Sequence, residues 1–379
     1  MAVRHLAESG TRSGDPLRTA TPGLRLRLVK VAHELELDEC GFALHQRPAA
    51  DHRTEDVART LSLAAGQAGD PGLGAGTRGA LTLLEQALNV RSGRFRARRR
   101  ADGVWSQQDC SLEAHARILR SLSKAAVDAD DLMTQRHAAR MFAYALPASA
   151  AFRDHRALAH GVLACAEALD APLVGGAAAT QLNQLGVRLA SVLEESVRLG
   201  GPEWPWPAPV VSASSAVVPH ALIHAAELSG RSDWLRYGLV VLRWLVSAQM
   251  GPERRFSFIG SQGWWRRGAS PARFEQHPIE ALTMLEASIK AYEVTGDESW
   301  AEVAEAAFAW FLGENDLGLA LADTRTGACH DGLQESGLNS ACSTDSTLDW
   351  LASVNAMQGL RQRHPGLARP LGSRRRLAS

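Results

Sequence analysis

Three acidic side chains lie in or beside segments rich in turn-forming residues, where a carboxyl group can face a bound molecule. They are Glu275, Asp331 and Asp345. Cleavage of a glycosidic bond requires two carboxyl groups flanking the bond, about 5–5.5 Å apart for retention of configuration and about 6.5–9.5 Å apart for inversion. We predict Glu275 as one catalytic acid and Asp345 or Asp331 as the other.

Each of these acids also has a structural explanation. Glu275 precedes a predicted helix, where a negative charge complements the helix dipole. Asp345 stands at a helix start and can cap it, and Asp331 precedes a glycine, as turn residues often do. Glu280 follows Glu275 by five residues. That spacing directs the two side chains to different faces, so at most one faces a funnel, and we select Glu275.

Tryptophans are concentrated in irregular segments rather than on helical faces. They are Trp105, Trp204, Trp206, Trp264 and Trp265. Flat aromatic rings suit the C–H faces of sugars, whose hydroxyls need paired donors and acceptors. The clustering favours an aromatic-lined sugar site. The alternative is that the rings only fill the core of a large helical assembly.

The elements that position these residues are predicted to be helices, because apolar residues recur with helical spacing and no convincing strand pattern occurs. Helices are predicted over 23–38, 53–67, 77–91, 111–127, 131–145, 153–169, 177–199, 214–229, 232–250, 277–295, 298–313 and 343–361. Helices with short links form hairpins, and six hairpins can close into a ring. We therefore predict an all-α protein with an (α/α)6 toroid fold.

In such a ring, the N-terminal ends of the inner helices and the longer loops build a central funnel. The longer irregular segments are 92–110, 200–213, 251–276 and 314–342. Long ordered loops often carry function. We predict one toroid domain over 23–362, between a flexible N-terminal segment (1–22) and a flexible basic tail (363–379) that contains Arg374, Arg375 and Arg376.

Composition argues against several classes of partner. Of 379 residues, 41 are Lys or Arg and 41 are Asp or Glu, so no net charge recruits nucleic acid. No run of about 18 uncharged apolar residues predicts a membrane span. Met1 to Pro22 does not resemble a signal peptide, and five scattered cysteines suit reduced thiols. We expect a cytoplasmic protein.

Several motifs in the second half of the chain are shared with one superfamily. They are Phe256-Ser-Phe-Ile-Gly, Gly263-Trp, Phe274-Glu-Gln-His-Pro-Ile-Glu-Ala, Trp310-Phe-Leu-Gly-Glu-Asn-Asp-Leu-Gly, Asp331-Gly-Leu and Thr344-Asp-Ser-Thr-Leu. As a set they resemble the six-hairpin glycosidase-like superfamily, in particular the helical-barrel domain found alone or fused to family-4-type bacterial glycosyltransferases. A weaker match includes Asp102-Gly-Val-Trp, His115-Ala-Arg, Trp204-Pro-Trp and Pro219-His-Ala-Leu.

The resemblance implies a carbohydrate-active protein with an oligosaccharide or glycoconjugate as ligand and a glycosyltransferase as a candidate partner. The implied ligand-binding residues are Trp105, His115, Arg117, Glu203, Trp204, Trp206, Trp264, Trp265, Arg273, Gln276, His277, Asn315, Asp316 and His330. Two places depart from the family pattern, since Ala208 and Ala213-Ser-Ser replace an expected carboxylate and tyrosine. The resemblance thus implies a diverged member, either glycoside hydrolase-like or a non-catalytic binding toroid.

A zinc site is the alternative to carboxylate chemistry. Cys329-His330 resembles the metal-binding pair of lanthionine cyclase-like toroids, as Ala159-His160-Gly161 resembles another of their motifs, and Cys342 would supply a third ligand. Their Trp-Cys-Tyr-Gly motif has no counterpart, so we predict no resident metal or cofactor.

Overall fold

The structure is a computed structural model that describes residues 51–66 and 71–367, together with residues 17, 20, 27, 28, 30 and 31. Six helices of the described chain form an inner layer: α2 (Thr54–Ala65), α4 (Leu112–Asp128), α6 (His155–Glu167), α8 (Val217–Ser229), α10 (Pro278–Thr295) and α12 (Thr344–Arg363). Five more lie outside them: α3 (Pro71–Ala87), α5 (Leu132–Ala145), α7 (Gly175–Gly200), α9 (Ser232–Gln249) and α11 (Glu298–Phe311). Short 3-10 helices are η2 (Leu146–Ala151) and η3 (Pro365–Leu367).

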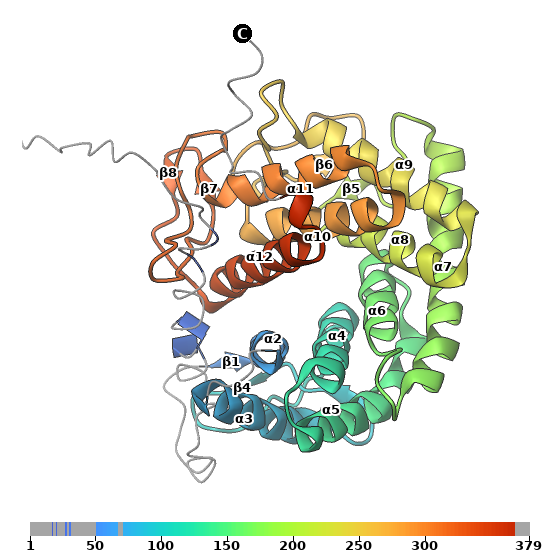
Figure 1. The fold of residues 1–379 in the computed structure, drawn as a ribbon, viewed down its shortest axis with the longest axis vertical. Helices are drawn as coiled ribbons and strands as arrows, with labels where there is room; N and C mark the ends of the chain where they lie inside the picture. Colours follow the sequence, from blue (N-terminus) through green and yellow to red (C-terminus); the bar gives the residue numbers. More distant parts are fainter. Residues whose placement is uncertain are drawn as a thin grey trace, which may run out of the picture.

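The inner helices form a closed ring. Each packs on the next in the series α2, α4, α6, α8, α10 and α12, and α12 packs on α2. Each of the five outer helices packs against the inner helix that precedes it (Figure 1). This arrangement confirms the predicted (α/α)6 toroid.

The two faces of the ring are built differently. Links from an inner to the next outer helix are short, as at 129–131, 230–231 and 296–297. Most links from an outer to the next inner helix are long, with 312–343 the longest described in full. Because inner and outer helices alternate in direction, the inner N-termini share one face. We call it the N-terminal face and the opposite one the C-terminal face.

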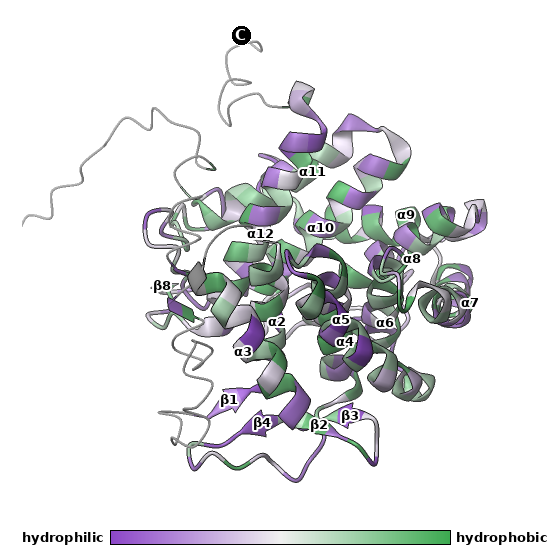
Figure 2. Cartoon of the chain, turned by 60° about the horizontal axis from the view of Figure 1, so that its bottom comes forward, coloured by the Kyte–Doolittle hydropathy of each residue, from purple (hydrophilic) through white to green (hydrophobic). Residues whose placement is uncertain are grey.

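Four antiparallel two-residue ribbons brace the loops of the N-terminal face. They pair β1 (His52–Arg53) with β4 (Arg98–Arg99), β2 (Leu88–Asn89) with β3 (Arg94–Phe95), β5 (Val210–Val211) with β6 (Trp265–Arg266), and β7 (Leu333–Gln334) with β8 (Gly337–Leu338). Figure 2 shows β1 and β4 as hydrophilic segments at the edge of the molecule. These pairings fix loops that the sequence pattern left irregular.

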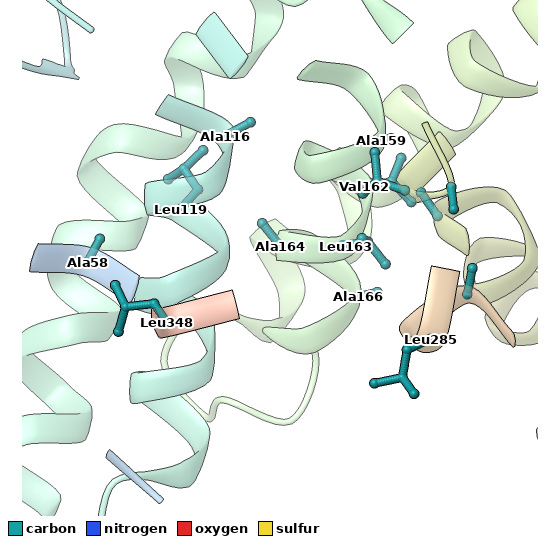
Figure 3. Close-up of a cluster of buried hydrophobic side chains, with 14 of the residues drawn as sticks. Ala58, Ala116, Leu119, Ala159, Val162, Leu163, Ala164, Ala166, Leu285 and Leu348 are labelled. Atoms are coloured by element: carbon teal, nitrogen blue, oxygen red, sulfur yellow. The ribbon is translucent and has the colours of Figure 1, made fainter. Parts of the chain in front are cut away.

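Small residues let the inner helices approach closely. Ala58, Ala116, Ala159 and Ala164 are fully buried among leucines and valines (Figure 3). On α6, a Cβ added at Gly161 would lie 2.8 Å from the Phe152 ring, so only glycine fits there. Close packing of this kind makes the ring a continuous apolar core.

Predicted helix boundaries agree with the structure within a few residues, with one exception. The helix predicted at 77–91 runs from Pro71 to Ala87, because proline suits a first helical turn and Leu88–Asn89 pair with Arg94–Phe95. The predicted helix 23–38 and the terminal segments 1–22 and 363–379 lie almost wholly outside the described residues. In the described part of the chain, every helix is too short or too polar to span a membrane.

Candidate active site

Charged side chains from the first turns of the inner helices meet at the N-terminal face. We call this set the N-terminal network; it consists of Arg53, Glu55, Arg59, Glu113, Arg117, Arg156, His160, Ser214, Glu280, Asp345 and Asp349. Every inner helix contributes a member, if Ser214 just before α8 is included. The network is a buried polar region that joins all six inner helices of the ring.

Arg117 is the centre of the network. Its Nη1 lies 2.7 Å from Glu55 Oε1 and its Nη2 lies 2.8 Å from Glu113 Oε1. Nη2 also donates to Ser214 Oγ at 3.2 Å, and Nε donates to His160 Nε2 at 3.1 Å. One guanidinium thus joins α2, α4, α6 and the start of α8, as a rigid planar donor can.

Two acids of α12 bind the arginines of α2. Asp345 forms ion pairs with Arg53, at 3.4 Å, and with Arg59. Asp349 lies one turn later and pairs with the same Arg59. Helical spacing of four residues places both carboxyls on one face. These pairs join the last inner helix to the first.

Carboxyl groups of the network differ in protonation. Burial raises the pKa of Glu280 to about 8 and that of Asp349 to about 7. Burial opposes ionisation of Asp345 as well, but Arg59 and Arg53 lower its pKa below the ordinary value. At neutral pH Glu280 is therefore protonated while Asp345 is ionised, and such a contrast is what acid and base catalysis requires. Glu280 Oε1 is held by the Ser214 backbone N–H at 2.9 Å.

His160 is held neutral. Burial and the neighbouring guanidiniums of Arg117 and Arg120 keep its pKa well below 6.5. Because Nε2 accepts from Arg117, the ring proton belongs on Nδ1, which has no partner among the described residues. His160 therefore offers one unused hydrogen-bond donor.

A cavity of about 980 Å³ lies inside the ring and ends on Arg117 and His160. It is lined by Leu17, Arg59, Ser62, Leu63, Gly66, Arg117, Arg120, Ser121, Lys124, Asp128, His160, Ile279, Leu282, Thr283, Glu286, Leu348, Ala352, Asn355, Ala356, Gln358, Gly359, Arg361, Gln362 and Arg363. The lining reaches the last turns of α2, α4 and α12, so the cavity extends toward the C-terminal face. Its size suits a small-molecule ligand.

Arg120 crosses this cavity region. Its Nε lies 2.9 Å from Glu167 of α6, and its Nη1 lies 3.0 Å from Glu286 of α10. The pair with Glu286 joins helices on opposite sides of the ring. Burying such a pair costs desolvation energy that the attraction repays only when geometry is good.

Of the predicted catalytic acids, only Asp345 belongs to the network. Glu275 lies in the loop before α10, where Gln334 Nε2 donates to its Oε1 at 3.1 Å and its φ is +62°. Asp331 accepts from the Ser343 backbone N–H at 2.7 Å. The N-cap of α12 is Ser343, so the capping explanation for Asp345 is wrong.

Of the predicted binding residues on or before α4, His115 and Trp105 have mainly structural contacts. Arg117 is the network centre described above, whereas His115 is fully buried and its Nε2 contacts the Ala145 carbonyl oxygen at 3.2 Å. Trp105 lies in the loop before α4, and its backbone pairs with Arg99. Only Arg117 of these three lines the cavity.

The motif residues before α10 and after α11 form a second cluster. Gln276 is fully buried, accepts from Trp310 Nε1 at 2.9 Å and donates to Asp316, which also binds Arg273 at 3.0 Å. Asn315 donates to the Trp310 carbonyl oxygen at 2.9 Å. These bonds hold the loops of the N-terminal face in place.

Two predicted histidines also bind loop atoms. His277 Nε2 lies 2.9 Å from Ser261 Oγ, and its Nδ1 lies 3.1 Å from the Asp331 carbonyl oxygen. His330 Nδ1 lies 2.7 Å from the Asn339 carbonyl oxygen and 3.7 Å from Cys342 Sγ. No group of three His, Cys, Asp or Glu ligands that could hold a metal occurs among the described residues.

The loop tryptophans do not line the cavity. Trp204 and Trp206 are each 4% exposed. With Trp244 of α9 and Trp265 they form a packed cluster, in which the Trp244 and Trp265 centroids are 4.6 Å apart. Trp264 and Glu203 also lie outside the lining. Within the described residues no Trp, Phe or Tyr lines this cavity, so the aromatic-lined sugar site stays a prediction.

Sequence reasoning missed part of this site. Arg59, Arg120, His160 and Asp349 were not among the predicted site residues, and Glu280 was considered but not selected. A usable signal was present, because Arg117, Arg120 and Lys124 share one face of a helix that the ring had to bury. Charges on a buried helical face indicate an internal polar site.

Comparisons with known proteins concern the fold. No protein-family model and no curated protein matches the sequence. Solved structures do match. A cellobiose 2-epimerase from Spirochaeta thermophila is 15% identical over 92% of this chain and 99% of that one, with a TM-score of 0.62. A D-mannose isomerase is 10% identical over 90% of this chain and 98% of that one, with a TM-score of 0.63. An α-mannanase of family GH76 from Bacteroides thetaiotaomicron is 9% identical over 94% of this chain and 98% of that one, with a TM-score of 0.58. The chain shares the (α/α)6 toroid fold of these structures.

Proposed function

We propose that this protein is a carbohydrate-active enzyme that binds a sugar or glycan in the central cavity and acts on it by acid/base catalysis. The observation that carries the proposal is the cavity itself, a large polar space that ends on Arg117 and His160 beside two buried carboxyl groups with raised pKa values. The solved structures of similar fold are described as sugar epimerases, isomerases and glycoside hydrolases, which supports a carbohydrate ligand.

The cavity offers the hydrogen-bonding groups that a sugar needs. Ser62, Ser121, Thr283 and Asn355 supply hydroxyl and amide groups around its wall. The Ser62 and Thr283 hydroxyls donate to helix carbonyl oxygens and can still accept from a sugar, whereas the Asn355 amide can donate and accept.

Glu280 replaces Glu275 as the candidate acid. It is protonated at neutral pH and joined through Ser214 to Arg117, which lines the cavity. Asp345, one of the catalytic acids predicted from the sequence, is the candidate ionised partner. Glu275 and Asp331 lie in the loop cluster and remain weaker candidates.

A product assay with matched variants tests this assignment. Purified protein would be incubated with neutral and anionic mono- and oligosaccharides, and products followed by NMR for new reducing ends or epimers. We expect Glu280→Gln to lower turnover by about 10²–10⁴-fold, the usual contribution of a positioned acid. Glu275→Gln is the matched control and should retain turnover. The opposite result would return the acid role to Glu275.

A non-catalytic binding toroid is the second candidate. It is favoured by one observation: three acids of the N-terminal network, Glu55, Asp345 and Asp349, are already bound to Arg59 and Arg117. Such a protein would bind glycans for a partner, for example a glycosyltransferase. Sugar binding by the folded protein without any product would support this candidate.

A further inference from the structure

We infer that the sugar bound in the central cavity carries an anionic group, a carboxylate or a phosphate, which binds Arg120 and Lys124 of α4. The inference rests on the proposed carbohydrate function and adds the substrate class. It comes from the unequal distribution of charge over the cavity wall.

One wall of the cavity is cationic. Arg117, Arg120 and Lys124 recur at helical spacing along α4, and all three line the cavity. The facing wall is mixed: Ile279 and Leu282 on α10 and Leu348 on α12 are aliphatic, whereas Asn355, Gln358 and Gln362 on α12 are polar. A ligand that matches both walls has a charged group on one side and both C–H surface and hydroxyls on the other.

Most of the carboxylates that pair with these cations do not line the cavity. The lining contains the cationic residues Arg59, Arg117, Arg120, Lys124, Arg361 and Arg363, but of acids only Asp128 and Glu286. The carboxylates that pair with Arg59 and Arg117 are not among the described lining residues. A ligand in the cavity therefore meets cationic groups first.

Two cations retain donors for a ligand. The ion pairs of Arg120 use Nε and Nη1, and its Nη2 has no partner among the described residues. Lys124 Nζ lies 4.0 Å from Glu167 Oε1, beyond hydrogen-bond distance, and its side chain is 36% exposed. Its charge also acts on two acids of the lining: burial raises the pKa of Asp128 against the charge of Lys124, and Arg120 and Lys124 lower the pKa of Glu286 against burial. Since Arg120 and Lys124 are one turn apart, their free donors can bind the same anionic group.

Calorimetric titration with three related sugars tests the inference: glucose, glucuronate and glucose 6-phosphate, with inorganic phosphate as the plain anion. We expect at least one anionic sugar to bind about tenfold more tightly than glucose and to weaken as salt rises. The carboxylate and phosphate arms distinguish the two sources of charge.

Lys124→Gln should remove most of the preference for the anionic sugar, and Lys124→Arg should keep it. Arg325→Gln removes the same charge from a side chain that is 83% exposed, and should change nothing. Circular dichroism of each variant checks folding.

Different failures separate the two proposals. Equal binding of glucose and both anionic sugars would overturn the charged-substrate inference while leaving the carbohydrate function intact. Inorganic phosphate that binds as tightly as the sugar phosphate would also overturn it, because the sugar would contribute nothing. If none of the three sugars nor any other carbohydrate binds, both proposals fail.

Discussion

The two faces of the toroid differ in how they use their polar residues: on one face they hold loops together, and toward the other they line the cavity. The N-terminal face carries most of the long loops, the β ribbons and the tryptophan cluster, yet its side chains are largely engaged with one another. The C-terminal face has short turns, yet the cavity reaches toward it between α2, α4 and α12. Loop length alone is therefore a poor guide to where this ring binds a ligand.

The difference follows from what each face must satisfy. Long loops carry many backbone and side-chain polar groups that must form hydrogen bonds when buried. Gln276 and Asn315 provide several of these hydrogen bonds. The inner helices beyond their first turns have no such loops to hold. Their charged residues, such as Lys124, can face open space.

Arg117→Met is expected to have the largest effect on this comparison, because it removes the centre of the N-terminal network. Glu55 and Glu113 would each lose their shortest ion pair and keep only the longer pairs with Arg53 and Arg156, at a cost of about 3 kcal/mol in the free energy of unfolding. Urea unfolding measures this cost. Arg231→Met, which breaks the exposed pair with Asp233, is the control and should change the free energy of unfolding far less. If both variants lose a similar free energy of unfolding, the ion pairs of Arg117 stabilise the fold no more than an exposed pair does.

Glu280 should make stability depend on pH. Its carboxyl has a pKa of about 8 in the folded protein and an ordinary value of 4.5 when unfolded, so the folded state binds the extra proton. The free energy of unfolding should fall as pH rises from 4.5 to 8, by about 1.4 kcal/mol per unit of pKa difference. Glu280→Gln should flatten this decline in urea titrations between pH 5 and pH 9. An unchanged slope would place Glu280 in a more polar setting.

Trp265→Ala tests whether the tryptophan cluster binds sugar. Because Trp265 packs against Trp204 and Trp244, we expect a loss of about 2 kcal/mol in the free energy of unfolding with no change in sugar affinity. Chemical denaturation and calorimetry give the two quantities separately. Loss of sugar binding in a folded variant would move the site to the N-terminal face.

The smallest expected effect lies on the outer layer. A Cβ added at Gly176, in the first turn of α7, meets nothing within 4 Å, so Gly176→Ala should raise the free energy of unfolding by about 0.5–1 kcal/mol. Gly161→Ala is the contrasting variant, since its Cβ would lie 2.8 Å from Phe152. Thermal unfolding should rise slightly in the first and fall in the second.

The sequence predicted the fold well because the signals are local. Helical stripes and end signals such as Gly296, with φ +69°, and Asp297, which accepts from the Ser299 backbone N–H, need only neighbouring residues. The closure of hairpins into a ring then follows from the apolar faces. A helix start such as Pro71 was missed because its glycine-rich first turns resemble a loop.

The site was harder to predict because its members are distant in sequence. Asp345 and Arg117 were named, but their network depends on Arg59 and Glu55, which come from another helix. The protonation of Glu280 depends on burial by the whole ring, which no local pattern encodes. Motif residues such as Gln276 gave a strong signal, although the structure places them in loop support.

The closure of α12 on α2 has a consequence for how the chain folds. Arg59 and Asp349 are 290 residues apart, so the pair that joins the ends of the ring forms only after almost the whole chain exists. Contacts of such long range slow folding. During synthesis, the side of α2 that packs on α12 therefore stays uncovered until α12 has been made. A chaperone that binds this side would protect the growing protein from aggregation.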